Sequence, residues 1–290
     1  MNVYPLQVEY KKQKEWAGSL MWMEMALGAI AGGLFVVSLF LESALGLIIA
    51  VVLMLVGKGV LLFAELGRPG RAFKVLMRPG ASWISRGAWA LLLFVVVGAI
   101  CVLPLLVSGL PWSPWTGIGK VLGIIGAILA VFLILYDGFF LGSAKGISFW
   151  SNASLPLLFG ASAFVGGLGA LTLIALLESP AYSFETLAVA NSVVLGLTLL
   201  TLFTFLRFAH ENEGGAKVSS ESLIKGELSM VFWMVTVVIG LVVPLVVSLI
   251  ALSGLFLSPV IWAAVGLLEI VGVFTLRSGI LRAGVYSPLL

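Results

Sequence analysis

The sequence predicts an all-α integral membrane protein with about eight transmembrane helices, arranged as two parallel four-helix bundles. Of its 290 residues, 61% are hydrophobic and only 10% are charged, whereas about a quarter of the residues in soluble domains are charged. Apolar runs of about 20 residues, long enough to cross the hydrocarbon, recur along the chain. Lys and Arg gather on alternate connections between these runs, as the positive-inside rule predicts for a multi-pass protein.

The apolar runs define the expected elements in chain order. The first 18 residues are polar, and the run that follows is too long for the core of a signal peptide, so we expect it to be retained as the first span. The chain then divides into a polar segment (1–19), a first four-helix unit (20–140), a connecting loop (141–154) and a second four-helix unit (155–290). The expected spans are Leu20–Leu41, Leu45–Ala64, Gly87–Val107, Val121–Phe140, Leu155–Leu177, Phe184–Leu206, Met230–Leu252 and Val260–Leu276.

The basic residues predict the orientation. An even number of spans returns both termini to one side of the membrane, here called the N side; the opposite is the C side. Only Lys120 falls on the C side, and Lys58 falls inside the second span. The asymmetry predicts a plasma-membrane protein with both termini in the cytoplasm, although a basic surface can instead be a docking site for an acidic partner. The N-side basic residues are Lys11, Lys12, Lys14, Arg68, Arg71, Lys74, Arg78, Arg86, Lys145, Arg207, Lys217, Lys225, Arg277 and Arg282.

One apolar segment recurs within the chain. Ala29–Leu39 (AIAGGLFVVSL) resembles Ala163–Leu173 (AFVGGLGALTL), with the paired glycines in register and the same predicted orientation. This similarity favours two parallel four-helix units. The alternative is that small-residue pairs recur wherever membrane helices pack closely, and the sequence leaves both interpretations open.

Cysteine and histidine are too few for most redox centres. The single cysteine, Cys101, permits no internal disulfide and no iron–sulfur cluster held by cysteines. The single histidine, His210, is expected in a polar loop (207–214), whereas a membrane diheme subunit needs several histidines on apolar helices. We therefore expect no haem, iron–sulfur cluster or metal in this chain, and no nucleic-acid partner.

Four charged residues lie more than one residue inside the ends of the expected spans: Glu24, Lys58, Asp137 and Glu269. A charge at the bilayer centre costs about 2.5 to 3.5 kcal/mol on insertion scales, so each is a functional candidate. At 1.5 Å per residue, Glu24 is about 6 Å, Lys58 about 10 Å and Tyr136-Asp137 about 5 Å inside the N-side ends of their spans. A polar pocket in this leaflet suits a ligand with an apolar tail and a polar head that exchanges protons and electrons, such as a quinone.

Structural roles are the alternatives for the same residues. Glu24, Lys58 and Asp137 can neutralise one another between helices or extend toward water. Tyr136 can be an aromatic residue of the membrane interface. Glu269 lies near the middle of the last span, where a carboxyl is protonated or paired, and it belongs either to a proton path or to helix packing.

The second connection, residues 65–86, carries five basic residues separated by Gly and Pro. It is typical of an ordered docking loop, in which the basic side chains would complement an acidic partner. A lipid-headgroup contact that includes Trp83 is the alternative. The five residues are Arg68, Arg71, Lys74, Arg78 and Arg86.

At this loop the sequence resembles the membrane-subunit family of NrfD and polysulfide reductase. Leu66–Arg86 closely matches the pattern L-G-R-P-x-R-x-x-x-x-L-x-x-P-x-S-W-I-S-R, with one additional residue between Pro79 and Ser82. A second element, Y-x-G with a downstream A-K-G-x-x-F-W, is present as Tyr136-Asp137-Gly138 and Ala144–Trp150. The final helix pair adds Phe232-Trp233, Gly240, Pro244, Leu276-Arg277 and Ala283-Gly284, so the resemblance covers nearly the whole chain.

The resemblance implies a membrane anchor that binds menaquinone or another quinone and lacks redox centres of its own. Its partners would be a ferredoxin-like four-cluster iron–sulfur subunit and a molybdopterin (Mo or W) catalytic subunit, in a complex of anaerobic respiration. The family's quinone site uses the tyrosine of the Y-x-G element, here Tyr136, together with polar residues of the first helix. Glu24 is the local candidate, where relatives often have His, Asn or Tyr around Met23–Leu27.

These observations lead to one expected mechanism and two alternatives. We expect Tyr136 to hydrogen-bond a quinone headgroup, Glu24 and Asp137 to exchange protons with it, and Lys58 to hold a carboxylate ionised. A secondary transporter would also explain carboxylates inside the membrane and an internal repeat, although its site would lie near the midplane. A passive anchor without quinone would remain active after substitution of Glu24 or Asp137.

Overall fold

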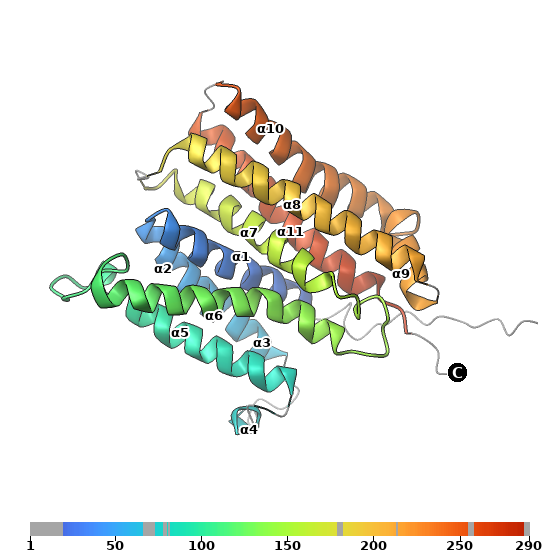
Figure 1. Ribbon diagram of the computed structural model, residues 1–290, viewed down its shortest axis with the longest axis horizontal. Helices are drawn as coiled ribbons and strands as arrows, with labels where there is room; N and C mark the ends of the chain where they lie inside the picture. Colours follow the sequence, from blue (N-terminus) through green and yellow to red (C-terminus); the bar gives the residue numbers. More distant parts are fainter. Residues whose placement is uncertain are drawn as a thin grey trace, which may run out of the picture.

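Eight helices within the described part of the chain are long and apolar enough to cross a membrane, which confirms the predicted fold class (Figure 1). The computed structural model describes residues 20–65, 73–77, 80, 82–178, 182–212, 214–254 and 258–286, and its elements there are all helices. Two short helices, α4 (Phe73–Leu76) and α9 (Gly215–Ile224), lie on N-side connections. The spans are α1 (Met21–Phe40), α2 with η1 and α3 (Ala44–Leu53, Met54–Val60, Leu61–Ala64), α5 (Trp83–Leu106), α6 (Gly117–Gly142), α7 (Leu155–Ile174), α8 (Phe184–Glu211), η3 with α10 (Val231–Val242, Val243–Leu252) and α11 (Pro259–Ala283).

Several helices extend past the predicted apolar runs at their N-side ends. Helix α5 begins at Trp83, where the Ser82 hydroxyl accepts a hydrogen bond from the Ser85 amide at 3.2 Å, so Arg86 lies in a helix rather than in the docking loop. Helix α8 continues to Glu211 and places His210 in its last turn, so the prediction of a polar loop there was wrong. Hydropathy marks the segment inside the hydrocarbon, whereas these helices continue into the headgroup region.

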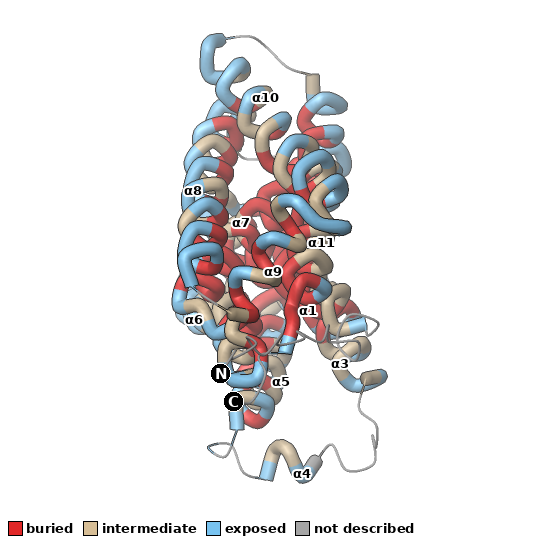
Figure 2. The backbone as a smooth tube through the Cα atoms, turned by 90° about the vertical axis from the view of Figure 1, so that its right-hand side faces the viewer, coloured by how far each residue is buried: buried red, intermediate tan, exposed pale blue. Residues whose placement is uncertain are grey.

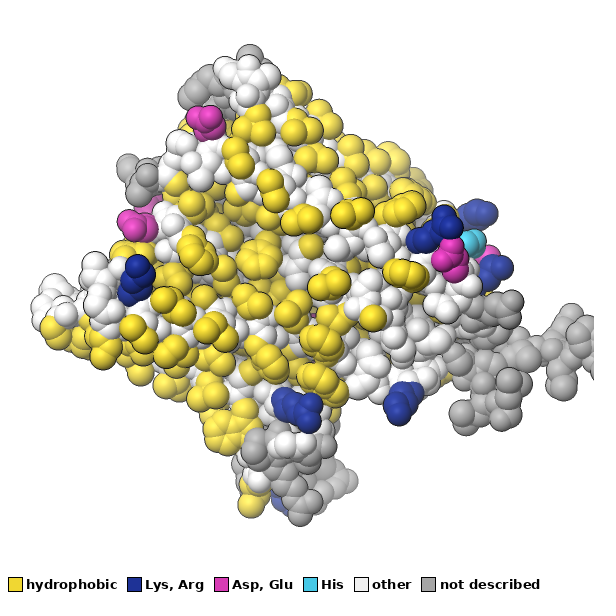
Figure 3. All heavy atoms as spheres, viewed as in Figure 1, with side chains coloured by type: hydrophobic (Ala, Val, Ile, Leu, Met, Phe, Trp, Pro, Cys, Tyr) yellow, Lys and Arg dark blue, Asp and Glu magenta, His cyan; other side chains and the backbone are white. Residues whose placement is uncertain are grey.

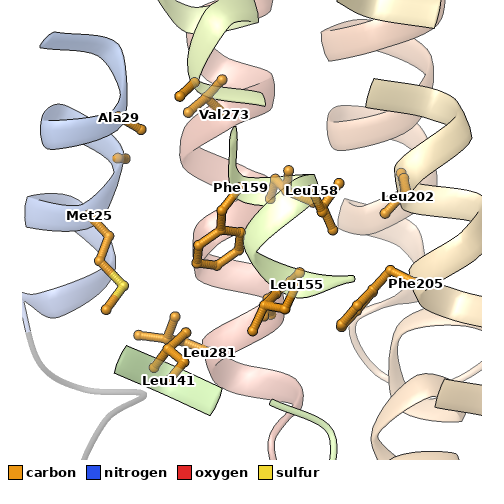
Figure 4. Packing of buried hydrophobic residues seen from close by; sticks show 14 of the residues in the cluster. Met25, Ala29, Leu141, Leu155, Leu158, Phe159, Leu202, Phe205, Val273 and Leu281 are labelled. Carbon is orange, nitrogen blue, oxygen red and sulfur yellow. The ribbon is translucent and has the colours of Figure 1, made fainter. Parts of the chain in front are cut away.

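Helices α1 and α7 form the centre of the molecule. Of their most apolar 18-residue windows, 72% and 78% of the residues are buried, against 28% to 44% in the other spans. Helix α11 packs against both of them, α5 and α6 lie on one side, and α8 and α10 lie on the other (Figures 1 and 2). Apolar side chains such as Met25, Leu141 and Phe159 fill the space between these helices (Figure 4). The outer helices expose apolar side chains, as lipid contact requires.

The central crossing depends on two glycines of the recurring segment. A Cβ atom on Gly33 would collide with the Ala163 carbonyl, and one on Gly167 would collide with the backbone of Gly33. The matched glycines therefore face one another and let the α1 and α7 backbones touch. The pairs α1–α6 and α1–α2 are repeated by α7–α11 and α7–α8. An internal repeat would produce this arrangement, but the division at residues 141–154 stays a prediction.

We expect Gly167→Ala to destabilise the protein by about 1 to 3 kcal/mol, because the added methyl group has no space at the crossing. Gly196→Ala is the matched control, since Gly196 lies on α8 and a Cβ atom there would have open space around it. It should be neutral or stabilising by up to about 1 kcal/mol, the usual gain for Ala over Gly in a helix. Thermal unfolding in one detergent measures both. Equal stability of the two variants would contradict the packing argument.

Charged side chains gather at the two ends of the helices, with apolar side chains between them (Figure 3). Basic side chains near α9 mark the N side, and Glu42, Glu178 and Glu185 lie at the C side. The Glu178 carboxylate accepts hydrogen bonds from the Ser43 hydroxyl at 2.8 Å and the Ala44 amide at 3.2 Å. The end of α7 is thereby joined to the start of α2. Which end faces the cytoplasm stays a prediction.

Candidate functional site

Three of the four charged residues predicted inside the spans meet between α1, η1 and α6. The Lys58 ammonium donates to Glu24 Oε2 at 2.8 Å and to Asp137 Oδ1 at 2.8 Å. All three residues are at most 3% exposed. The ion pairing considered from the sequence is therefore present, and any further role of these residues is a matter for the proposal below.

Local sequence makes room for the Lys58 side chain. Gly28 follows Glu24 by one helical turn, and a Cβ atom there would overlap the Lys58 aliphatic stem. Lys58 itself lies between Gly57 and Gly59 in η1, a π-helical segment inside the second span. Such segments are rare and occur frequently at functional sites. The Lys58 side chain can therefore lie flat against α1 and reach both Glu24 on that helix and Asp137 on α6.

Tyr136, directly before Asp137 on α6, is 8% exposed and lies among aromatic rings. Its ring centroid is 5.9 Å from that of Phe140, 6.3 Å from that of Phe132 and 6.5 Å from that of Trp83. Gly87 of α5 lies against the phenol, where any side chain would collide with it. The Tyr136 ring is thus held in place beside the ion pairs.

The Tyr136 hydroxyl is the polar end of this arrangement. Asp137, Lys58 and Glu24 are all close enough to interact with it electrostatically. Within the described residues, no hydrogen bond from or to this hydroxyl occurs. A phenol that can both donate and accept is therefore available to a ligand at the edge of a buried charged cluster.

The predicted docking residues are only partly described. Lys74 lies on α4 and Arg86 in the first turn of α5, and both are exposed. The Arg86 guanidinium lies 5.0 Å above the Trp83 ring, whose other neighbours include Tyr136. A continuous set of contacts therefore runs from the N-side surface to the phenol. Arg68, Arg71 and Arg78 lie outside the described residues.

Arg277 is a buried charge, although its position in the sequence predicts a place on the N-side surface. The structure places it inside α11 with 0% exposure, where Nη2 donates to the Phe159 carbonyl at 2.9 Å. Its guanidinium carbon lies 3.5 Å from the centroid of the Phe159 ring. Asp137 and Glu24 are close enough to interact with it electrostatically. Glu24, Asp137 and Lys58 alone carry a formal charge of −1. The positive charge of Arg277 brings the buried cluster to zero.

A sequence signal for Arg277 existed. The residues one turn away on the same helix face, Val273, Ile280 and Leu281, are all apolar and buried. This pattern indicates that the arginine faces the protein interior rather than water. The apolar run ends at Leu276, so hydropathy alone places Arg277 outside the span.

Two other features lie apart from this cluster. Glu269 is on α11 in the second half of the chain, against Gly169 of α7. A cavity of about 290 Å³ lies at the N-side ends of α7 and α8, lined by residues that include Ser148, Asn152 and Phe208. None of the buried charged residues lines it. Among the described residues, no three His, Cys, Asp or Glu side chains are grouped as a metal site.

Comparison with known proteins supports the family resemblance. The family model described as "Polysulphide reductase, NrfD" matches residues 20–288. Protein NrfD of Escherichia coli is 33% identical over 165 residues, which are 54% of this chain and 50% of that protein. The C subunit of the polysulfide reductase of Wolinella succinogenes is 28% identical over 171 residues, 56% of this chain and 53% of that protein.

A third relative covers a similar length. The Protein NrfD homolog of Haemophilus influenzae is 28% identical over 161 residues, which are 54% of this chain and 50% of that protein. The chain therefore spans about half the length of the curated relatives it matches. The match to the family model over most of the chain shows the family.

Proposed function

Because the chain belongs to the polysulphide reductase NrfD family, we propose that it is the membrane-anchoring, quinone-binding subunit of a respiratory oxidoreductase. It would exchange electrons between the membrane quinone pool and an iron–sulfur partner. That partner would be a ferredoxin-like four-cluster subunit, joined to a molybdopterin catalytic subunit that determines the terminal substrate. The multi-pass fold and the name of the Wolinella relative, one component of a reductase, are consistent with this role.

The observation that carries the proposal is the position of the Tyr136 hydroxyl beside the buried Glu24–Lys58–Asp137 cluster. A quinone supplies two-electron, two-proton chemistry when it is bound. Its headgroup needs a hydrogen-bond partner, nearby proton-exchanging groups and an apolar path for its tail. Tyr136 provides the first, the carboxylates the second, and the aromatic side chains around Tyr136 the third. The residues present therefore fit the group.

Each residue of the cluster has a distinct role in this proposal. Lys58 bonds one oxygen of each carboxylate, which favours their ionised forms despite burial. Glu24 Oε1 and Asp137 Oδ2 are not bonded to Lys58 and can accept protons from a ligand. Arg277 offsets the second negative charge without bonding either carboxylate directly. Tyr136 orients the headgroup by a hydrogen bond to one of its oxygens.

The N-side face is the proposed docking surface for the iron–sulfur partner. Lys74 and Arg86 lie on it, and Arg86 contacts the aromatic group that includes Tyr136 through Trp83. An acidic partner would be held in position by these basic side chains, and one of its iron–sulfur clusters would then lie close to the Tyr136 phenol. Arg68, Arg71 and Arg78, outside the described residues, are predicted to extend this surface. The plasma membrane and a cytoplasmic N side complete the proposal.

The test is quinol-dependent reduction of iron–sulfur clusters in the complex purified through this chain. We expect Tyr136→Phe to slow cluster reduction about tenfold to a hundredfold, because one hydrogen bond to the headgroup is lost. Optical and EPR spectra before and after addition of a menaquinol analogue measure the rate. Tyr182→Phe, at the C side before α8, is the matched control and should leave it unchanged.

Two outcomes would contradict the proposal. An unchanged rate in Tyr136→Phe would remove Tyr136 from the site. A colourless protein that purifies without an iron–sulfur partner and transports a solute in liposomes would favour a secondary transporter instead. The position of the charged cluster in one leaflet, rather than at the midplane, argues against that alternative.

A further inference from the structure

A second group of buried polar side chains lies in the other half of the molecule. Glu269 of α11 and Asn191 of α8 are both 0% exposed. Within the described residues, neither carboxyl oxygen of Glu269 and neither amide atom of Asn191 has a hydrogen-bond partner. Buried polar atoms are almost always paired, so each exception needs an explanation. Here two exceptions occur on helices that belong to the same half.

Helix register places these two side chains at the same depth. The rings of Phe184 on α8 and Trp262 on α11 stack with centroids 6.0 Å apart. Asn191 and Glu269 each follow their aromatic residue by seven residues, and both helices cross the membrane in the same direction. Seven residues return to nearly the same helix face about 10 Å further along. Asn191 and Glu269 are therefore buried at a similar depth in the second half of the molecule, on helices that both pack against α7.

Helix α7 leaves space on this side. It packs against both α8 and α11, and Glu269 lies against its Gly169 rather than against a larger side chain. A Cβ atom there would be 3.0 Å from Glu269 Oε2. The carboxyl is thus enclosed by backbone and apolar groups on the α7 side. Asn191 is the buried polar side chain that the register places at the same depth.

No counter-charge is available to Glu269 among the described residues. Helices α7, η3 and α10 contain no charged residue. Glu24 on α1 is bonded to Lys58, and Lys217 and Glu221 on α9 lie at the N-side end. Helix α11 has one other buried charged residue, Arg277. It lies eight residues from Glu269, about 12 Å along the helix. His210 and Arg207 are near the N-side end of α8, and Glu185 is at its C-side start.

Without a counter-charge, the neutral acid is the favoured form of the Glu269 carboxyl, since a lone carboxylate in apolar surroundings is costly. A neutral carboxyl has one O–H donor and an acceptor oxygen, and a side-chain amide has both donors and an acceptor. The two groups are therefore complementary. They do not bond one another in the structure, so a hydrogen bond between them would pair atoms that have no partner among the described residues.

We propose that Glu269 and Asn191 form a proton-binding site in the second half of the molecule. The Glu269 carboxyl holds a proton and exchanges it with the C-side face, and the Asn191 amide solvates the carboxyl. The step is a proton transfer between Glu269 Oε and water, with no change of oxidation state. Ser248 on α10, buried and also without a partner among the described residues, lies about 6 Å from the C-side end of its helix. By its depth, Ser248 lies between the site and that face.

Infrared difference spectroscopy on the complete complex tests the site. We expect a C=O stretching band of a protonated carboxylic acid that Glu269→Gln removes and that shifts on transfer to D₂O. Asn191→Leu should move the band to higher frequency, because the proposed hydrogen bond from the amide to the carboxyl can no longer form. It should also slow hydrogen–deuterium exchange of the band about tenfold. The proposed quinone function does not enter this experiment, so the two proposals can fail separately.

Matched variants make the result decisive. Thr236→Val removes a buried hydroxyl of the same half, bonded to Thr275 at 2.8 Å, and should leave the band and its exchange unchanged. The proposal is overturned if no protonated-acid band depends on Glu269, or if Asn191→Leu leaves the band where it was. A band that never exchanges in D₂O would show a carboxyl used only for packing, which also overturns it.

Discussion

Replacement of Lys58 by methionine is expected to lower the free energy of unfolding by about 3 to 5 kcal/mol, the usual cost of removing one partner from a buried ion pair. Methionine keeps most of the aliphatic stem that packs on Gly28. What it removes is the ammonium that bonds Glu24 and Asp137, both at 2.8 Å. Two buried carboxylates then lose their bonded counter-charge. Denaturation of the purified protein in a single detergent measures the loss.

The control for this variant is Lys120→Met, at an exposed position in the first turn of α6. It should change stability by less than about 0.5 kcal/mol. Removing the carboxylate charges as well, in Lys58→Met with Glu24→Gln and Asp137→Asn, should recover most of the lost stability, since no unpaired carboxylate remains. A Lys58→Met protein as stable as the control would mean that the carboxylates are neutralised by other groups.

Substitution of Glu24 by glutamine should lower the rate of quinol oxidation by about 10² to 10⁴, the typical contribution of a positioned acid or base. Glutamine keeps the shape of the side chain but cannot take up a proton. The Lys58–Asp137 bond is retained, so the fold should persist. Glu24 is buried, and the iron–sulfur partner should therefore remain bound. Turnover with a menaquinol analogue and the cluster content of the same preparation are the two measurements.

Glu185→Gln, in the exposed first turn of α8, is the matched control and should retain full activity. Full quinol oxidation by Glu24→Gln would exclude Glu24 from proton exchange and support a passive anchor. Loss of the iron–sulfur partner together with activity would assign Glu24 a structural role instead. Only slow turnover in an intact complex supports the proposed role.

The fold could be predicted from sequence because its signal is local. An apolar run of about 20 residues marks a span wherever it occurs, and all eight expected runs correspond to helices in the structure. Helix ends were predicted less well, as Trp83 and His210 show, because a helix can continue through polar residues after its apolar run has ended. The π-helical turns around Lys58 and Phe232 have no comparable signature in composition.

The site could be predicted only in part. Glu24, Lys58 and Asp137 were identifiable because a charge within an apolar run is costly, but which of them bond depends on the rotation of three helices. Arg277 was misplaced because it follows the end of its apolar run. Asn191 carried no signal, since a single uncharged polar residue is common in membrane helices. The loop arginines at 68, 71 and 78 stay predictions.

The burial of α1 between α6, α7 and α11 has a consequence for biosynthesis. Helix α1 is made before these three neighbours, because the ribosome delivers N-terminal segments first. Only three residues separate α1 from α2, so Lys58 reaches Glu24 soon after α1 is made, and a charge-neutral hairpin can leave the translocon together. The Gly33 face then meets lipid until α7 is synthesised. The second half of the chain thus completes the burial of α1.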